Sequence, residues 1–167
     1  SRSFQLPAPV KPLRWVTIDR TICDGPLSKN GFIEGKADGF GIFERWILRL
    51  GYFIRREQGT TALADDLVVF LQPDRPVDAA FADAPRRYVE AGGHILVLDS
   101  AENTNSTSAA LLAPFKLELR PHPQPDGTLE PEKGSQGLPA LTVQTAREVV
   151  GGTPFCQLNG RPVAARA

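Results

Sequence analysis

Two short runs of apolar and β-branched residues dominate the hydrophobic pattern of this chain, one at 65–71 and one at 94–100. Residues 77–91 between them have helical character, and Gly92 and Gly93 close that stretch. A buried strand, a crossover helix, a glycine stop and a second strand form one βαβ unit of a parallel sheet. Open α/β sheets bind ligands beyond the carboxyl ends of their strands. The unit therefore predicts where a site lies, but not its chemistry.

The pattern predicts a strand and a helix before this unit, and a second strand after that helix. The first strand is Trp15–Asp19, and a polar, glycine-bearing loop follows at 20–37. Such a long connection is expected to act as a lid or a partner surface. Asp38 can cap the next helix, and Tyr52 begins a short strand at 52–54. Apolar residues at helical spacing are assigned to the buried face of this helix: Phe40, Phe43, Trp46, Ile47 and Leu50.

The second half of the chain has weaker signals. A cap within 105–107 can begin a short helix through Leu112, and 116–119 alternates like a strand. Residues 120–139 hold five prolines and three glycines and are expected to form a long loop. Short late strands are expected at 141–143, 155–158 and 162–164, the last two joined by a hairpin turn at Asn159 and Gly160.

These elements predict one three-layer α/β domain with a mostly parallel sheet over 14–167, after a proline-rich lead-in at 1–13. The short late strands extend the sheet or form a small β appendage. A length of 167 residues suits a single domain.

Composition excludes several classes of function. Nineteen basic and nineteen acidic residues cancel, so no global field favours nucleic acid. No apolar run approaches the roughly 20 residues that a membrane-spanning helix needs, so this segment is not expected to insert into a membrane. The chain has no methionine and no signal-peptide pattern, and it is expected to be a segment of something longer. Cys23 and Cys156 can form a disulfide in an oxidising compartment or remain separate thiols.

Four motifs of the chain form a recognisable set. They are the strand that ends at Asp19, the run Leu-Arg-Leu-Gly-Tyr at 48–52, the run Val-Glu-Ala-Gly-Gly at 89–93, and the short helix with its aromatic residue at 109–115. Together they resemble the class I glutamine-amidotransferase-like superfamily. The likeness covers about residues 14–119 and, weakly, 138–167. It is strongest to uncharacterised branches, among them auxiliary domains of gliding-type ABC transport systems and bacterial domains of unknown function. It implies a flavodoxin-like sheet in a larger, membrane-associated bacterial protein, with this segment outside the cytoplasm and truncated at its C-terminus.

The pattern of the catalytic members is missing. Those enzymes place a cysteine in a Gly-x-Cys-x-Gly elbow, because the strained turn needs small neighbours. The corresponding residues 98–102 are Leu-Asp-Ser-Ala-Glu, and the downstream His122 has no glutamate two positions later. A glutaminase is therefore not expected. Ser100 lacks a nearby base, which leaves it a weak candidate nucleophile beside the two strand-terminal carboxylates, Asp19 and Asp99.

Polar side chains are predicted to gather at the carboxyl edge of the sheet. The set comprises Asp19, Asp24, Gln72, Asp74, Asp99, Ser100, Glu102 and Asn103. Clustered carboxylates can hold a divalent cation or divide acid and base roles. The same residue types also cap strands and turns for backbone reasons alone. No cofactor is otherwise indicated.

Two functions follow from this set. The preferred one is a non-catalytic ligand-binding or assembly domain that uses the carboxyl edge and the 20–37 loop to hold a small ligand or a protein partner. The alternative is a hydrolase, metal-assisted or not, with Asp19 and Asp99 as its foremost carboxylates. A third interpretation is a purely structural role in a complex.

Overall fold

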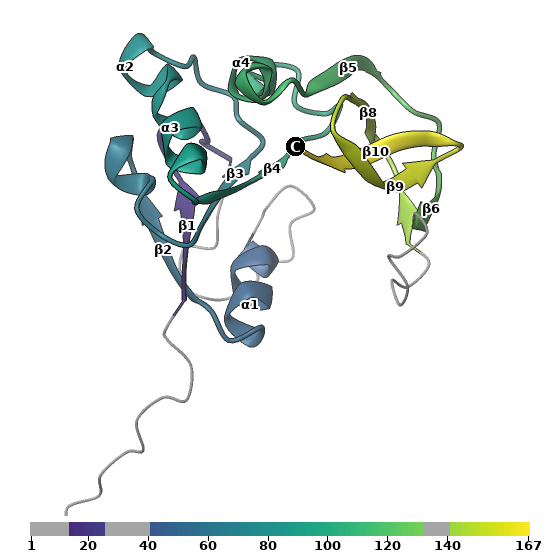
Figure 1. Ribbon diagram of the computed structural model, residues 1–167. Helices are drawn as coiled ribbons and strands as arrows, with labels where there is room; N and C mark the ends of the chain where they lie inside the picture. The colour runs from purple at the N-terminus through teal and green to yellow at the C-terminus, as the bar shows by residue number, and fades with distance from the viewer. Residues whose placement is uncertain (1–13, 26–40, 132–140) are drawn as a thin grey trace, which may run out of the picture.

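A four-stranded parallel sheet forms the first half of the molecule (Figure 1). The computed structural model describes residues 14–25, 41–131 and 141–167. The sheet has the order β2-β1-β3-β4, with all neighbours parallel. Its strands are β1 (Trp15–Asp19), β2 (Phe53–Glu57), β3 (Leu67–Leu71) and β4 (His94–Leu98). The expectation of a mixed α/β chain with a parallel sheet is confirmed. The lead-in at 1–13, most of the 20–37 loop and the Asp38 cap lie outside the described residues.

The βαβ unit is present between β3 and β4. Its crossover consists of two short helices, α2 (Ala79–Ala82) and α3 (Ala84–Glu90). Asp78 caps α2 by accepting the N–H of Phe81 at 2.7 Å, and Pro85 lies in the first turn of α3, where its missing N–H costs no helical hydrogen bond. Gly92 ends the crossover with φ of 97°, a conformation that favours glycine.

One face of the sheet packs against α1 (Gly41–Arg49). The core on this side consists of Val16, Ile18, Ile47, Val69 and Leu71, with Phe43, Tyr52, Ile54, Leu67 and Leu96 packed around it. Two positions assigned to the buried face of the helix are solvent-exposed instead: Trp46 is 62% exposed and Leu50 is 71% exposed. Leu50 follows the last helical residue.

The opposite face packs against α2, α3 and α4 (Ser108–Leu112). Its core consists of Ile22, Cys23, Val68, Phe70, Phe81 and Leu111. Two 3₁₀ turns complete this half, η1 (Gly59–Ala62) before β3 and η2 (Ala113–Phe115) after α4. The short helix expected through Leu112 is thus confirmed.

The strand β2 is longer than predicted. The expected strand at 52–54 covers only its start, because Arg55, Arg56 and Glu57 continue it. An edge strand tolerates charges that a central strand does not, since one of its sides faces solvent. The apolar pattern stops before the strand does.

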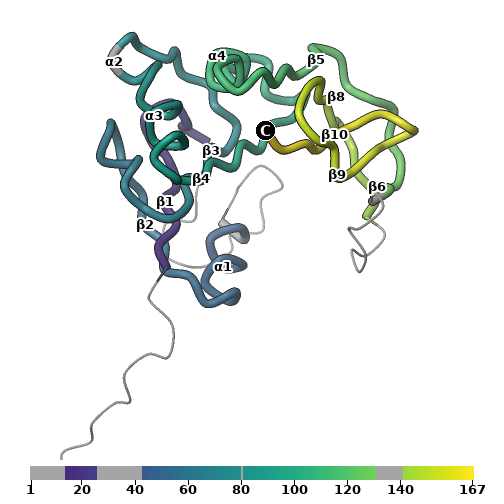
Figure 2. The backbone as a smooth tube through the Cα atoms, in the orientation of Figure 1, coloured from purple at the N-terminus to yellow at the C-terminus, as the bar shows by residue number. Residues whose placement is uncertain are grey.

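Antiparallel strands form the C-terminal part, which lies to one side of the parallel sheet (Figures 1 and 2). One sheet has the order β10-β9-β6-β7, and β5 pairs with β8 in another. The strands are β5 (Glu118–Pro123), β6 (Gly127–Pro131), β7 (Thr142–Val143), β8 (Arg147–Val150), β9 (Thr153–Leu158) and β10 (Arg161–Arg166). The hairpin turn at Asn159 and Gly160 is confirmed, with φ of 52° and 73°.

The loop expected at 120–139 is wrong over 120–131, where the chain completes β5 and forms β6. Pro121 and Pro123 lie in β5, which pairs with β8 alone, and Pro131 ends β6, so the missing N–H groups cost little strand pairing. β8 was not predicted.

Within the described ranges, no helix is long and apolar enough to cross a membrane. Cys23 and Cys156 are both buried and unpaired with each other.

Candidate functional site

The carboxyl edge of the sheet brings the predicted polar residues into separate groups. Asp19 ends β1 and is completely buried. Its Oδ2 accepts the backbone N–H groups of Thr21 at 3.1 Å and Ile22 at 2.9 Å, which holds the chain in a turn as it leaves the strand. Its Oδ1 is also buried and has no hydrogen-bond partner among the described residues. Asp19 thus combines a backbone role with one unsatisfied oxygen.

Asp24 and Asp74 form a second group, at the surface. Asp74 Oδ1 accepts the N–H of Asp24 at 3.0 Å. The Asp24 carboxylate is half-exposed and pairs with Arg20 at 3.3 Å and with Arg75 at 2.5 Å. Two guanidinium groups therefore already neutralise the carboxylate that a cation would need.

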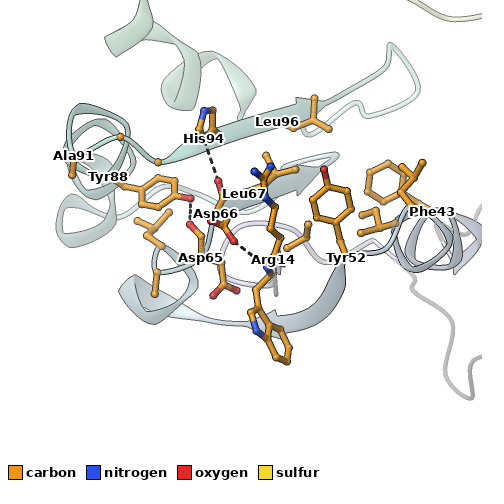
Figure 3. Close-up of a pocket in the computed structure, with 18 of the residues that line it drawn as sticks. Arg14, Phe43, Tyr52, Asp65, Asp66, Leu67, Tyr88, Ala91, His94 and Leu96 are labelled. Atoms are coloured by element: carbon orange, nitrogen blue, oxygen red, sulfur yellow. Dashed lines mark hydrogen bonds between the residues drawn. The ribbon is translucent and has the colours of Figure 1, made fainter. Parts of the chain in front are cut away.

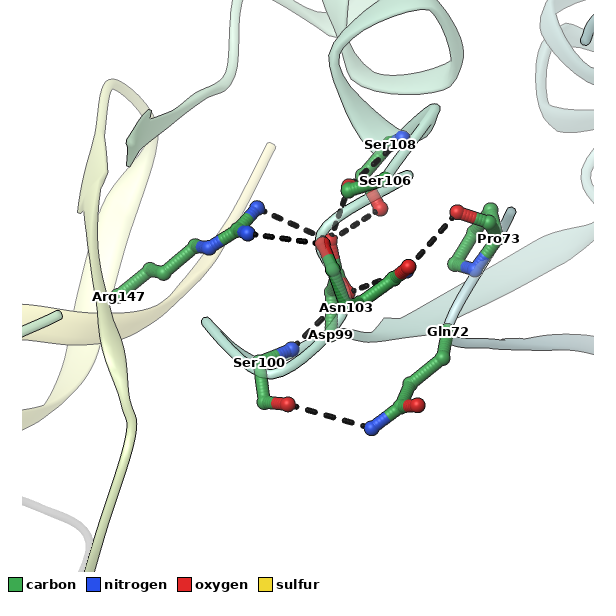
Figure 4. Close-up of polar contacts among 8 residues, drawn as sticks. All are labelled: Gln72, Pro73, Asp99, Ser100, Asn103, Ser106, Ser108 and Arg147. Atoms are coloured by element: carbon green, nitrogen blue, oxygen red, sulfur yellow. Dashed lines mark hydrogen bonds and ion pairs between the residues drawn. The ribbon is translucent and has the colours of Figure 1, made fainter. Parts of the chain in front are cut away.

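Asp99 is the centre of a buried hydrogen-bond network (Figure 4). Its Oδ1 accepts the backbone N–H of Ser100 and the side-chain amide of Asn103, each at 2.9 Å. Its Oδ2 accepts the hydroxyl groups of Ser106 and Ser108 and lies 3.5 Å from Nη1 of Arg147 in β8. The Asp99 side chain is only 1% exposed. Both oxygens are occupied by protein donors, which is the environment of a structural carboxylate.

The remaining predicted residues surround this network. Asn103 also donates to the carbonyl of Pro73 at 2.9 Å, so it ties the end of β4 to the end of β3. Gln72 Nε2 donates to Ser100 Oγ at 3.2 Å, and Gln72 adopts a φ of 46°. Glu102 is exposed. The structure therefore brings Gln72, Asp99, Ser100 and Asn103 together, apart from the Asp19 and Asp24 groups.

The nucleophiles at this edge are not activated. The hydroxyl of Ser100 accepts from Gln72, and no histidine contacts it among the described residues. Burial, followed by the carboxylate of Asp19, raises the pKa of the Cys23 thiol well above its ordinary value, so the thiolate is disfavoured. Within the described residues, no group of three His, Cys, Asp or Glu side chains is placed to hold a metal ion.

A hollow lies at the opposite, amino edge of the parallel sheet (Figure 3). It is a groove of about 1160 Å³, bounded by α1, by the starts of β1, β3 and β4, and by the turn after α3. We call it the amino-edge groove. Its apolar lining includes Phe43, Trp46, Ile47, Leu50, Leu67 and Leu96. Ligand pockets are usually apolar hollows with a few polar groups, and this groove fits that description.

Hydrogen bonds hold the wall of the groove in place. Arg55 binds the Asp65 carboxylate through Nε at 2.7 Å and Nη2 at 2.6 Å, and the hydroxyl of Thr17 donates to the same carboxylate. The hydroxyl of Tyr88 donates to the carbonyl oxygen of Asp65 at 2.5 Å. These contacts hold the segment before β3 against β1, β2 and α3.

Arg14 brings a positive charge to the amino-edge groove. It precedes β1, and its carbonyl accepts the N–H of Phe53 at 2.9 Å. Because side chains alternate along a strand, Arg14 shares the α1 face with Val16. Its guanidinium extends between Tyr52 and Leu67 (Figure 3) and forms no hydrogen bond or ion pair with the described residues. The groove therefore combines an unpaired guanidinium with apolar side chains.

The sequence offered only a weak signal for this groove. Apolar residues such as Trp46 were assigned to the core, and an apolar pattern alone does not reveal whether a second element covers them. None of the protein-family models, curated proteins and solved structures compared with the chain matches it. The groove and the Asp99 network are therefore interpreted from their own chemistry.

Proposed function

We propose that this chain is a non-catalytic ligand-binding domain of a larger protein, and that the amino-edge groove is its binding site. The observation that carries the proposal is the groove itself, about 1160 Å³ of mostly apolar hollow beside exposed Trp46 and Leu50. Exposed apolar surface of this extent commonly marks a site of binding. This places the site at the edge opposite to the one predicted from the sequence.

The contacts at the carboxyl edge support a role without catalysis. Described side-chain and backbone groups donate to both oxygens of the Asp99 carboxylate, and the Asp24 carboxylate is paired with two arginines. The Cys23 thiol is held in its neutral form by burial. A general base needs a free lone pair within reach of its substrate, which the buried Asp99 carboxylate lacks.

The proposed relationship is to the non-catalytic branch of the class I glutamine-amidotransferase-like superfamily, in a membrane-associated bacterial parent chain. The strand order β2-β1-β3-β4 agrees with the first four strands of the flavodoxin-like order. Helices pack on both faces of the sheet, in keeping with three layers. The antiparallel C-terminal sheets are an addition to that plan.

One observation favours the hydrolase alternative. The buried Oδ1 of Asp19 has no hydrogen-bond partner among the described residues, and a cation or a proton can satisfy such an oxygen. Thermal melting with Mg²⁺, Ca²⁺ and Mn²⁺ tests it, because a ligand of the native state raises the melting temperature. A rise in melting temperature that Asp19→Asn abolishes favours a cation site. Unchanged melting temperatures with all three ions exclude that site.

The binding proposal is tested with Nile red, a neutral dye that becomes fluorescent in apolar sites. Leu96→Lys places a charge in the floor of the groove, and we expect it to weaken dye binding about tenfold or more. Leu98→Lys is the matched control, since Leu98 lies two residues along the same face of β4, is 37% exposed and does not line the groove.

A second variant guards against misfolding. Trp46→Ala removes a side chain that is 62% exposed, so we expect it to weaken dye binding with little change in stability. Equal dye binding by the unmodified chain and by Leu96→Lys, Leu98→Lys and Trp46→Ala contradicts the proposed site.

A further inference from the structure

We propose that the ligand of the amino-edge groove is an amphiphilic monoanion, a free carboxylic acid with an apolar tail, whose carboxylate pairs with Arg14. This inference rests on the proposed function and names the class of ligand for the same groove.

The position of Arg14 supplies the charged end of the site. β1 lies between β2 and β3, so the residue before it is flanked by Tyr52 and Leu67 on the α1 face. The guanidinium of Arg14 has no partner among the described residues (Figure 3). A guanidinium presents a planar fork that binds a carboxylate through two parallel hydrogen bonds. The groove therefore offers one directional anion site at its sheet end.

The apolar tail has a continuous surface beside this charge. Phe43, Trp46, Ile47 and Leu50 of the α1 segment lie across from Leu67 and Leu96 of the sheet. The helix side chains and the sheet side chains bound the same hollow, and Trp46 and Leu50 remain largely exposed there. Covering such surface removes it from water, which favours an apolar tail over a polar body.

The neighbouring acids favour a single negative charge on the ligand. Asp65 and Asp66 both line the groove beside Arg14. The Asp65 carboxylate is neutralised by Arg55. Asp66 is exposed, and its carboxylate accepts the uncharged N–H of Trp15 at 3.1 Å and has no ion pair with the described residues. A second negative charge on the head group is repelled by Asp66, whereas a monoanion is compensated by Arg14.

The natural fluorescence of the protein reports on this site. The chain has two tryptophans, Trp15 and Trp46, and both line the groove. Their emission is followed at about pH 8, where an ordinary carboxylic acid is ionised, while dodecanoate is added below its micelle concentration. Dodecanol has the same tail without the charge, and dodecyl phosphate carries a second charge. We expect dodecanoate to bind about tenfold more tightly than either.

Variants assign the charge. We expect Arg14→Gln to weaken dodecanoate binding about tenfold and to leave dodecanol binding unchanged. Arg14→Lys keeps the positive charge without the forked guanidinium, so we expect its dodecanoate affinity to lie between those of the unmodified protein and Arg14→Gln. Arg166→Gln is the matched control, since Arg166 is an exposed arginine in β10, outside the groove.

The outcomes separate the two proposals. If Nile red binds in the groove but Arg14→Gln leaves dodecanoate affinity unchanged, the inference is overturned and the binding function stands. If neither the dye nor any amphiphile binds, both fall. Sedimentation with phosphatidylcholine vesicles that contain phosphatidylglycerol tests the other source of such a ligand. If the chain binds vesicles but not monomeric dodecanoate, the proposal of a free acid is overturned in favour of a membrane surface.

Discussion

Arg147 of β8 reaches the carboxylate of Asp99, which follows β4, at 3.5 Å, and its Nη2 donates to the carbonyl of Asn103 at 3.1 Å. This contact joins the antiparallel part of the chain to the carboxyl edge of the parallel sheet. The backbone strengthens the joint, since the N–H of Ala101 donates to the carbonyl of Thr145 at 2.9 Å. The residue selected from the sequence as a catalytic candidate thus connects two parts of the molecule.

We expect Asp99→Ala to lower the free energy of unfolding by about 3–5 kcal/mol, because it leaves Arg147 and several polar groups buried without their acceptor. Urea denaturation followed by circular dichroism measures the loss. Arg161→Ala is the control, because Arg161 forms an exposed ion pair with Glu148 that contributes at most about 1 kcal/mol. A similar small effect for both variants contradicts the structural role of Asp99.

Two glycines with positive φ are expected to differ sharply in their tolerance of alanine. Gly151 has a φ of 92° and Gly160 has a φ of 73°, so alanine is strained at both by about 1 kcal/mol. A Cβ at Gly151 lies 2.2 Å from the carbonyl oxygen of Lys116, whereas nothing lies within 4 Å of one at Gly160.

The Gly151→Ala variant should therefore lose about 1–3 kcal/mol more than Gly160→Ala, since the backbone of Lys116 must shift. Thermal melting of the two variants side by side makes the comparison. Equal melting temperatures are inconsistent with the close approach of the turn at Gly151 to Lys116.

The thiol of Cys23 should resist labelling in the native state. Burial and the Asp19 carboxylate raise its pKa, so the thiolate population stays low at pH values where an ordinary cysteine, with a pKa of about 8.5, is ionised. In a Cys156→Ala variant, Cys23 is the remaining cysteine. We expect slow reaction with a disulfide reagent, little faster as the pH rises through about 8.5, and rapid reaction in urea. Fast labelling of Cys23 in the native protein, at a rate that rises with pH, contradicts a buried thiol with a raised pKa.

Stability should fall in alkaline solution through Tyr88. Burial, and then the nearby carboxylates of Asp65 and Asp66, raise its pKa above the ordinary value. The contribution of the neutral phenol is complete below about pH 10, where the unfolded chain also keeps its proton, and it is lost as the pH rises through the higher folded pKa. The urea midpoint of the unmodified protein should therefore drop more steeply above about pH 10 than that of Tyr88→Phe.

At neutral pH the Tyr88→Phe variant is expected to be less stable by about 1 kcal/mol, because the hydrogen bond to the Asp65 carbonyl is lost. Near-ultraviolet absorbance of a Tyr52→Phe variant follows the ionisation of Tyr88 alone, since the chain has two tyrosines. Parallel pH profiles for the unmodified protein and Tyr88→Phe contradict the assignment.

The elements that the sequence predicts well are those whose apolar pattern is also their packing pattern. β3 is apolar throughout and lies in the middle of the sheet, with helices over both its faces. β2 was predicted only at its start, since Arg55 and Arg56 are accommodated by ion pairs with Asp65 and Glu44. The partner acids lie elsewhere in the chain, so a local pattern does not reveal them.

The candidate site was predicted in part, for a related reason. The position of Asp99 at a strand end follows from the sequence, but its donor Arg147 lies 48 positions later, in a strand that carries no clear signal. The amino-edge groove was missed because Trp46 has the spacing of a core residue. Only the packing shows that no other described element covers it.

The charged residues that interrupt the apolar pattern of β2 have a second consequence. β2 ends the parallel sheet, so its outer side presents backbone groups that the other described strands leave unpaired. Such a border can recruit the strand of another molecule and start aggregation. Three charged residues follow Phe53 and Ile54 in β2, and charged side chains on an edge strand disfavour pairing with the strand of another molecule. The ion pairs of Arg55 and Arg56 thus let one strand both complete the sheet and keep neighbouring molecules apart.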